Sequence, residues 1–185
     1  MSGHSKWAQI KHKKAVTDAK KGQLFSKMVR EITIAAKEGG PNPESNPRLR
    51  AAQDRARALG LPKDNMERAI LRASGAGADM ALQEFLYEAA APGGVMILIE
   101  GITDNKNRTL AEIKKILSER DVKLVPQNSL LWNFKKVWTG DGKDYLPNTS
   151  IDIPASEREK LTLLLDKLSE QDDVQEVYTN TANSF

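Results

Sequence analysis

Hydrophobic residues recur at helical spacing through the first part of the chain. Over 18–38 the apolar side chains return every three or four positions, lysines and glutamates take the other faces, and a Gly-Gly-Pro stretch ends the pattern. This spacing predicts an amphipathic helix. Two shorter helices are expected at 47–59 and 63–73, the first preceded by Asn46 as a capping side chain and begun by a proline. Together they predict a compact three-helix domain.

The second half of the chain has residue types that are typical of strands. Strands are expected at 82–89, 95–99, 130–134, 151–153 and 174–178, and helices at 110–117 and 161–168. Read from residue 95 onward, the order is β-α-β-β-α-β, the ferredoxin-like split unit, with one extra strand before it. We expect Trp132 and Phe134 in its core. The predicted fold class is α+β: an N-terminal three-helix basic domain followed by a ferredoxin-like domain with an extra N-terminal strand.

The net charge of +3 hides a division of charge along the chain. Residues 1–73 contain 16 Lys or Arg and 7 Asp or Glu, whereas the rest contains 12 and 18. The sign changes at a Gly- and Ala-rich stretch, where a domain boundary is expected. We therefore predict a basic arm with a three-helix nucleic-acid-binding domain over 1–73, a linker over 74–81, and an α/β domain over 82–185.

Composition excludes several classes of function. The chain has no cysteine, and its longest apolar run, 95–99, is far shorter than a membrane-spanning helix. The N-terminus lacks the apolar segment of a secretory signal, so a cytoplasmic protein is expected. The two histidines have no clustered partner ligands, and neither a phosphate-binding glycine loop nor a nucleophile with its base can be recognised. We expect no enzyme activity, metal or cofactor.

The first thirty residues are the strongest functional signal. They hold eight Lys or Arg against one acid, Asp18. Lysines spaced along an arm can each approach a phosphate, and Trp7 offers a face on which an unpaired base can stack. The candidate nucleic-acid-binding residues are His4, Lys6, Trp7, Lys11, His12, Lys13, Lys14, Lys20, Lys21, Lys27, Arg30, Arg48 and Arg50. A solvated tail and ordinary charged helix faces are the alternative interpretation.

A second polar cluster precedes the helix expected at 110–117. Its members are Thr103, Asp104, Asn105, Asn107, Arg108 and Thr109. Such residues can cap a helix or form an active site. Because no nucleophile and base accompany them, the capping interpretation is favoured and the role of the loop stays open.

Several ordered motifs resemble one protein family. They are SGHSKW at 2–7, KHKK at 11–14, GQLFSK at 22–27, AAKEGG at 35–40, NPRLR at 46–50, PKDN at 62–65, ERAI at 67–70, PGG at 92–94, TDNKNRT at 103–109 and DDVQEVY at 172–178. These motifs resemble the YebC/PmpR family, whose mitochondrial relatives include a translational activator of cytochrome oxidase. The resemblance implies a non-catalytic regulator with a helical N-terminal domain. Usual members have a further α/β domain inserted after the strand matching 130–134, whereas this chain continues almost directly through 139–142 to its last elements.

Three functions stay open on this basis. The resemblance favours a DNA-binding transcriptional regulator that contacts duplex phosphates. The arm, together with the lack of a recognisable set of base-reading side chains, favours a translation factor that binds ribosomal RNA or tRNA on the ribosome. The third is a protein-interaction module whose acidic half binds a partner. No membrane partner is expected. The sequence leaves the oligomeric state open, with a monomer as one option.

Overall fold

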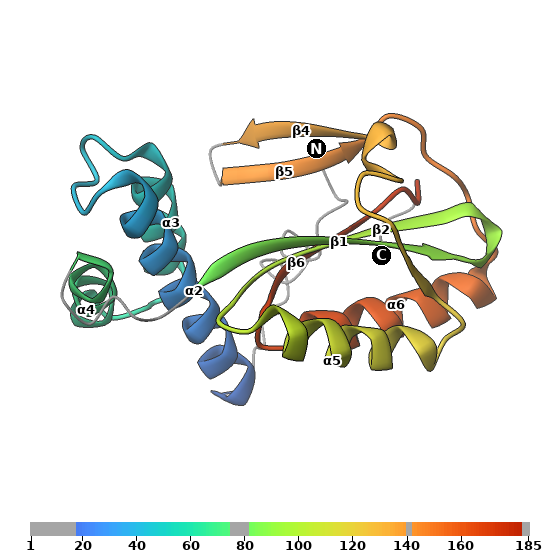
Figure 1. Cartoon of the computed structure of the whole chain (residues 1–185), viewed down its shortest axis with the longest axis horizontal. Coiled ribbons are helices and arrows are strands. Elements are labelled where there is room, and N and C mark those ends of the chain that lie inside the picture. The colour runs from blue at the N-terminus through green and yellow to red at the C-terminus, as the bar shows by residue number, and fades with distance from the viewer. Residues whose placement is uncertain (1–17, 75–81, 140–141, 183–185) are drawn as a thin grey trace.

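A computed structural model describes residues 18–74, 82–139 and 142–182 of the 185-residue chain. Three helices come first: α2 (Asp18–Gly39), α3 (Pro47–Ala58) and α4 (Lys63–Ser74). Figure 1 shows them together at one end of a twisted sheet. Their buried core is made of one isoleucine, two leucines, two methionines and alanines, which allow close approach of the helices: Met28, Ile32, Ala35, Ala36, Leu49, Ala52, Ala56, Leu61, Met66 and Ala69.

The start of α3 shows why the chain turns where it does. Asn46 is the N-cap, and its side chain accepts a hydrogen bond from the backbone N–H of Leu49 at 3.0 Å. Its amide donates back to the carbonyl of Ala35 in α2 at 2.8 Å. The buried amide therefore satisfies the ends of two helices at once, and the predicted cap and first-turn proline are confirmed.

The main sheet has four antiparallel strands in the order β3-β1-β2-β6. Its strands are β1 (Gln83–Ala91), β2 (Val95–Thr103), β3 (Lys123–Val125) and β6 (Val174–Thr179). A short 3-10 turn, η1 (Pro92–Gly94), joins β1 to β2. Helices α5 (Lys106–Ser118) and α6 (Ala155–Ser169) cover one face, where their leucines and isoleucines pack against the sheet (Figure 1).

A separate two-stranded sheet lies over the opposite face. It consists of β4 (Phe134–Thr139) and β5 (Gly142–Pro147) and follows a 3-10 turn, η2 (Leu131–Asn133). Phe134 and Tyr145 pack on Leu98 and Tyr178 of the main sheet, and the two tyrosine rings meet edge to face at 5.1 Å. The hairpin is therefore fixed at its base by aromatic contacts.

The fold class predicted from the sequence is confirmed: a helical N-terminal region is followed by a β-rich α+β domain. Several strand assignments were wrong. The strand expected at 82–89 is present as β1 and lies inside the main sheet, between β3 and β2, but the short β3 was not predicted, and 130–134 leads from η2 into the separate hairpin. At 151–153 only an isolated bridge joins Ile151 to Thr181. Alternation shows which residues share a face, but strand partners depend on contacts distant in sequence.

No helix in the described ranges is both long enough and apolar enough to cross a bilayer.

Gly101 in β2 provides a test of how closely β2 packs against Phe85 of β1 and the backbone of Asp173. A Cβ at this position would overlap the carbonyl oxygen of Asp173 and the ring of Phe85. We expect Gly101→Ala to lower the free energy of unfolding by about 2 kcal/mol, because backbone and a buried ring must both move. Gly22→Ala in α2 is the control, since its Cβ would meet nothing within 4 Å and alanine should stabilise a helix by about 0.5–1 kcal/mol. Urea unfolding measures both, and equal effects would contradict the packing argument.

Candidate nucleic-acid interface

Seven of the predicted nucleic-acid-binding residues lie outside the described residues. They are His4, Lys6, Trp7, Lys11, His12, Lys13 and Lys14. The remaining candidates lie on α2 and at the start of α3, where the structure divides them into residues that contact the rest of the protein and residues that face solvent.

One face of α2 is docked on the turn between α6 and β6, residues 169–173. Gln23 donates to the carbonyl of Glu170 at 2.6 Å, and the ammonium of Lys20 lies 3.5 Å from the Glu170 carboxylate. Lys27 is 5% exposed, and its Nζ donates to the carbonyl of Ser169 at 2.5 Å. Lys27 therefore has no surface to offer a phosphate in this arrangement.

Burial sets the protonation of Lys27. Desolvation of the ammonium lowers the pKa of Lys27 to about 8, although Glu176 and Asp172 act in the opposite direction. A cation in this position is costly to bury, because only part of its hydration is replaced by protein oxygens.

Asp173 is the centre of the contact between the helices and the sheet. Its side chain is 2% exposed and accepts from Arg30 of α2 at 2.6 Å. Arg108 and Thr109, from the first turn of α5, donate at 2.8 and 2.6 Å, and Thr103 at the end of β2 donates at 3.1 Å. Burial alone would raise the pKa of Asp173, but the hydrogen bonds from Thr109 and Arg108 and the charge of Arg30 lower it.

The polar loop of the TDNKNRT motif acquires a structural role from this arrangement. Asn105 is the N-cap of α5 and accepts from the backbone N–H of Arg108 at 3.1 Å, which confirms the capping interpretation. Asp104 accepts from the Arg108 guanidinium at 2.7 Å. Lys106 and Asn107 are exposed. The loop therefore positions Arg108 and Thr109 on Asp173.

Three predicted cations lie away from the docked face. Arg48 bonds two carboxylates, Glu38 at 2.5 Å and Glu84 of β1. Arg50 is exposed and donates to the backbone carbonyls at positions 43 and 44, at 3.2 and 3.1 Å. Lys21 is exposed over the ring of Phe25, 5.6 Å from its centroid. Of these three, Arg50 and Lys21 are available to an anionic ligand.

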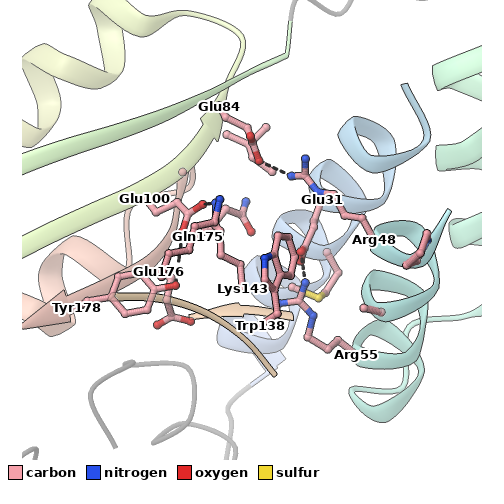
Figure 2. A pocket seen from close by; sticks show the side chains of 16 residues that line it. Glu31, Arg48, Arg55, Glu84, Glu100, Trp138, Lys143, Gln175, Glu176 and Tyr178 are labelled. Atoms are coloured by element: carbon pink, nitrogen blue, oxygen red, sulfur yellow. Dashed lines mark hydrogen bonds and ion pairs between the residues drawn. The ribbon is translucent and has the colours of Figure 1, made fainter. Parts of the chain in front are cut away.

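A cleft of about 310 Å³ lies between α2 and α3, the main sheet and the β4–β5 hairpin (Figure 2). Its charged and aromatic lining residues are Glu31, Arg48, Arg55, Glu84, Glu100, Lys136, Trp138, Lys143, Glu176 and Tyr178. Arg55 pairs with Glu31, and Lys143 pairs with Glu100. Burial also lowers the pKa of Lys143. The walls of the cleft are therefore largely charge-compensated.

Trp138 at the end of β4 is the residue of this cleft that sequence reasoning missed. It is 69% exposed, and the ammonium of Lys136 lies 5.4 Å from the centroid of its ring. Trp132 is 67% exposed, so its predicted place in the core was wrong, whereas Phe134 is buried as predicted. One signal in the sequence could have pointed to Trp138. Two lysines precede it directly after Phe134, which indicates that the strand leaves the buried core before it reaches the tryptophan.

Family models cover nearly all of the chain. The TACO1/YebC N-terminal domain matches residues 5–76, and the TACO1/YebC second and third domain matches residues 82–139 and 141–181. The chain belongs to the TACO1/YebC family. It is 54% identical over 136 residues to a probable transcriptional regulatory protein of Dictyoglomus turgidum, an alignment that covers 74% of this chain and 55% of the relative.

Longer alignments show how the family member differs from its relatives. A probable transcriptional regulatory protein of Fervidobacterium nodosum is 36% identical over 235 residues, covering 97% of this chain and 93% of the relative. A conserved hypothetical protein of Aquifex aeolicus has a crystal structure with a TM-score of 0.85, at 31% identity, covering 95% of this chain and 96% of that chain. The first relatives are matched over only about half of their length.

The difference is internal. The alignment to the Fervidobacterium protein spans 235 residues, 50 more than the 185 residues of this chain, so at least 50 of its positions have no counterpart here. The family model is interrupted at residue 140, between the end of β4 at Thr139 and the start of β5 at Gly142. This agrees with the predicted lack of an inserted domain, and in the sequence the interruption falls between Trp138 and Lys143.

Replacing Asp173 tests its central position. Asp173→Asn keeps the shape but leaves Arg30 and Arg108 without their buried counter-charge, so we expect the free energy of unfolding to fall by about 3 kcal/mol. Asp104→Asn is the matched control, because it removes an exposed carboxylate from the same Arg108 and should change stability little. Chemical denaturation at neutral pH measures both variants, and a small effect at Asp173 would argue against the central role.

The lowered pKa of Lys27 predicts a pH dependence of stability. Between about pH 8 and about pH 10 the unfolded lysine keeps its proton, whereas the folded lysine has largely lost it. The unfolded state then binds more protons, so stability rises with pH by at most about 1.4 kcal/mol per unit, and this dependence is flat below the folded pKa. The free energy of unfolding should be measured across this pH range for the unaltered chain and for Lys27→Met. The difference between the two isolates Lys27, because all other groups titrate in both chains. A constant difference between the two would show that Lys27 titrates normally.

Proposed function

We propose that the chain is a nucleic-acid-binding regulator of gene expression that acts in the cytoplasm without catalysis. Relatives bear the name probable transcriptional regulatory protein, which supports a regulatory role. The observation that carries the proposal is the excess of cations in residues 1–73, 16 against 7 acids. Part of this excess is free for a ligand: Lys21, Lys37, Arg50 and Arg72 are exposed and have no carboxylate partner within the described ranges.

Two buried acids, Asp173 and Glu88, are engaged in structural hydrogen bonds. Asp173 already accepts hydrogen bonds from two arginines and two threonines. Glu88 is 1% exposed and accepts from the backbone N–H groups of Asn128 and Leu130, both at 2.5 Å. Carboxylates saturated in this way hold the fold together and are poorly placed to exchange protons with a substrate.

We assign different roles to the two parts of the chain that have separate hydrophobic cores, the three helices and the α/β part. Residues 1–73 form the nucleic-acid-binding unit, 74–81 link it to the second unit, and residues 82–185 form the α/β unit that orients it. Lys27 and Arg30 on the docked face of α2 hold the two units in this orientation. The arm, Lys21 and Arg50 are then the cations that can bind phosphates. Contacts of this kind read charge and shape rather than base sequence.

Duplex DNA and structured RNA are the two candidate targets. The names of the relatives favour transcriptional control through DNA. The exposed Trp138 beside the cleft favours RNA, including ribosomal RNA or tRNA on a ribosome, because stacking requires an unpaired base. Sedimentation of native lysate through sucrose at low and high salt, followed by sequencing of the bound nucleic acid, separates them. Salt-sensitive migration with ribosomes would exclude duplex DNA as the main target, and recovery of promoter DNA alone would exclude the ribosome.

Removing lysines from the arm tests the charge argument directly. Changing Lys11, Lys13 and Lys14 to Ala should weaken binding and reduce the slope of log affinity against log salt by about 2.7 for duplex or about 2.1 for a single strand. The control removes the same charge from the second unit, at the exposed Lys114, Lys115 and Lys123. Fluorescence anisotropy with labelled 20-mers at several salt concentrations measures the slope. If both triple variants changed it equally, only net charge would matter and the arm would be a solvated tail.

A further inference from the structure

We propose that the cleft of Figure 2 binds one unpaired base of a single-stranded nucleic acid, stacked on Trp138. This inference rests on the proposed function and adds a specific site for the unpaired base. The cleft lies between the helical unit and the α/β unit, so this site would give the α/β unit a part in binding. The argument rests on Trp138 itself, the charges of the walls, and polar groups in the walls that lack partners.

Trp138 is placed as a stacking surface. The residue lines the cleft, yet 69% of it remains exposed, whereas the aromatic rings at the base of the same hairpin are buried. Pairing of Trp138 with Lys143 and of Lys136 with Tyr145 puts these four side chains on the hairpin face that looks toward the main sheet. The hairpin is anchored through Phe134 and Tyr145, so the indole is held over the opening by a fixed support.

The charges of the cleft walls and rim favour a neutral ring inside the cleft and a phosphate at its rim. Within the cleft, Arg48 pairs with Glu84, Arg55 with Glu31, and Lys143 with Glu100, so a charged group entering it would meet compensated walls. At the rim, Lys136 is exposed near the indole and has no carboxylate partner among the described residues, and Lys135 beside it is likewise exposed. A nucleotide combines these features, because its base is planar and uncharged while its phosphate is anionic.

Two buried donors in the walls have no acceptor within the described residues. They are Nε2 of Gln175 on β6 and Nε of Arg55 on α3, and both residues line the cleft. Unsatisfied buried donors are costly, and a ligand that brings acceptors into the cleft can relieve this cost. The ring nitrogens and carbonyl oxygens of a nucleobase are acceptors of this kind.

The shape of the site selects single strands. A cleft of about 310 Å³ is at the lower end of the usual range for small-molecule pockets, which suits one nucleoside and excludes a double helix. Bases in a duplex are stacked on both faces and cannot offer a face to an indole. We therefore expect the cleft to distinguish unpaired from paired nucleic acid, whereas the arm responds to charge in both.

The experiment uses the full chain and single substitutions at two tryptophans. Trp138→Ala should weaken binding of a 12-nucleotide single-stranded RNA by about tenfold while leaving binding of a duplex of equal length unchanged, since stacking contributes about 1–3 kcal/mol per base. Trp132→Ala is the matched control, because it is an equally exposed tryptophan that does not line the cleft. Trp138→Phe should restore most of the affinity. Thermal unfolding of each variant verifies that the fold is intact.

A spectroscopic measurement adds a readout at the site itself. In a chain carrying Trp7→Phe and Trp132→Phe, Trp138 is the single tryptophan. Its fluorescence should be quenched by the single strand and not by the duplex. Single-strand affinity that is unchanged in Trp138→Ala, or quenching by both ligands alike, would overturn the stacking site while leaving the proposed function intact. Failure of the unaltered chain to bind any nucleic acid would overturn both.

Discussion

The buried carboxylate of Asp173 joins three parts of the chain that are distant in sequence. Arg30 reaches it from α2, Arg108 and Thr109 from the start of α5, and Thr103 from the end of β2. A carboxylate that is 2% exposed is stable only when its oxygens accept enough hydrogen bonds and its charge is balanced. Arg30 supplies part of this compensation only when the helices lie against this end of the sheet, so Asp173 couples the position of the helical unit to that of β2 and α5.

This dependence changes the meaning of the cations in the first half of the chain. Lys27 and Arg30 have the composition of a nucleic-acid-binding face, but they are used to dock α2 on the α6–β6 turn. The cations left over, with the arm, are those that can respond to an external polyanion. The same docking sets α3 opposite the β4–β5 hairpin and so creates the cleft in which Trp138 lies. Orientation of the two units and formation of the candidate base site are therefore two results of one contact.

The sequence predicted the helices better than the sheet. The apolar period and the cap of Asn46 act within a few residues, so the limits of α2, α3 and α4 were close to those observed. Strand partners depend on contacts between distant segments, which is why the sequence did not show that β1 lies between β3 and β2, and the three-residue β3 gave no pattern. The motif at 103–109 marked an important loop, but its role became clear only with Asp173, some 65 residues further on.

By itself, the sequence determined the basic and acidic halves, the α+β class, the family, and the absence of cysteine chemistry, since each depends on composition or on local order. Only the tertiary structure decided which cations form internal contacts, which carboxylate they share, and which exposed tryptophan lines a cleft. Burial and ion pairing are properties of residues brought together from separate segments, and the pattern of one segment cannot contain them. Lys20, Lys27 and Lys37 look alike along α2, yet the fold gives them an exposed ion pair, a buried hydrogen bond and an exposed ammonium without a carboxylate partner in the described ranges.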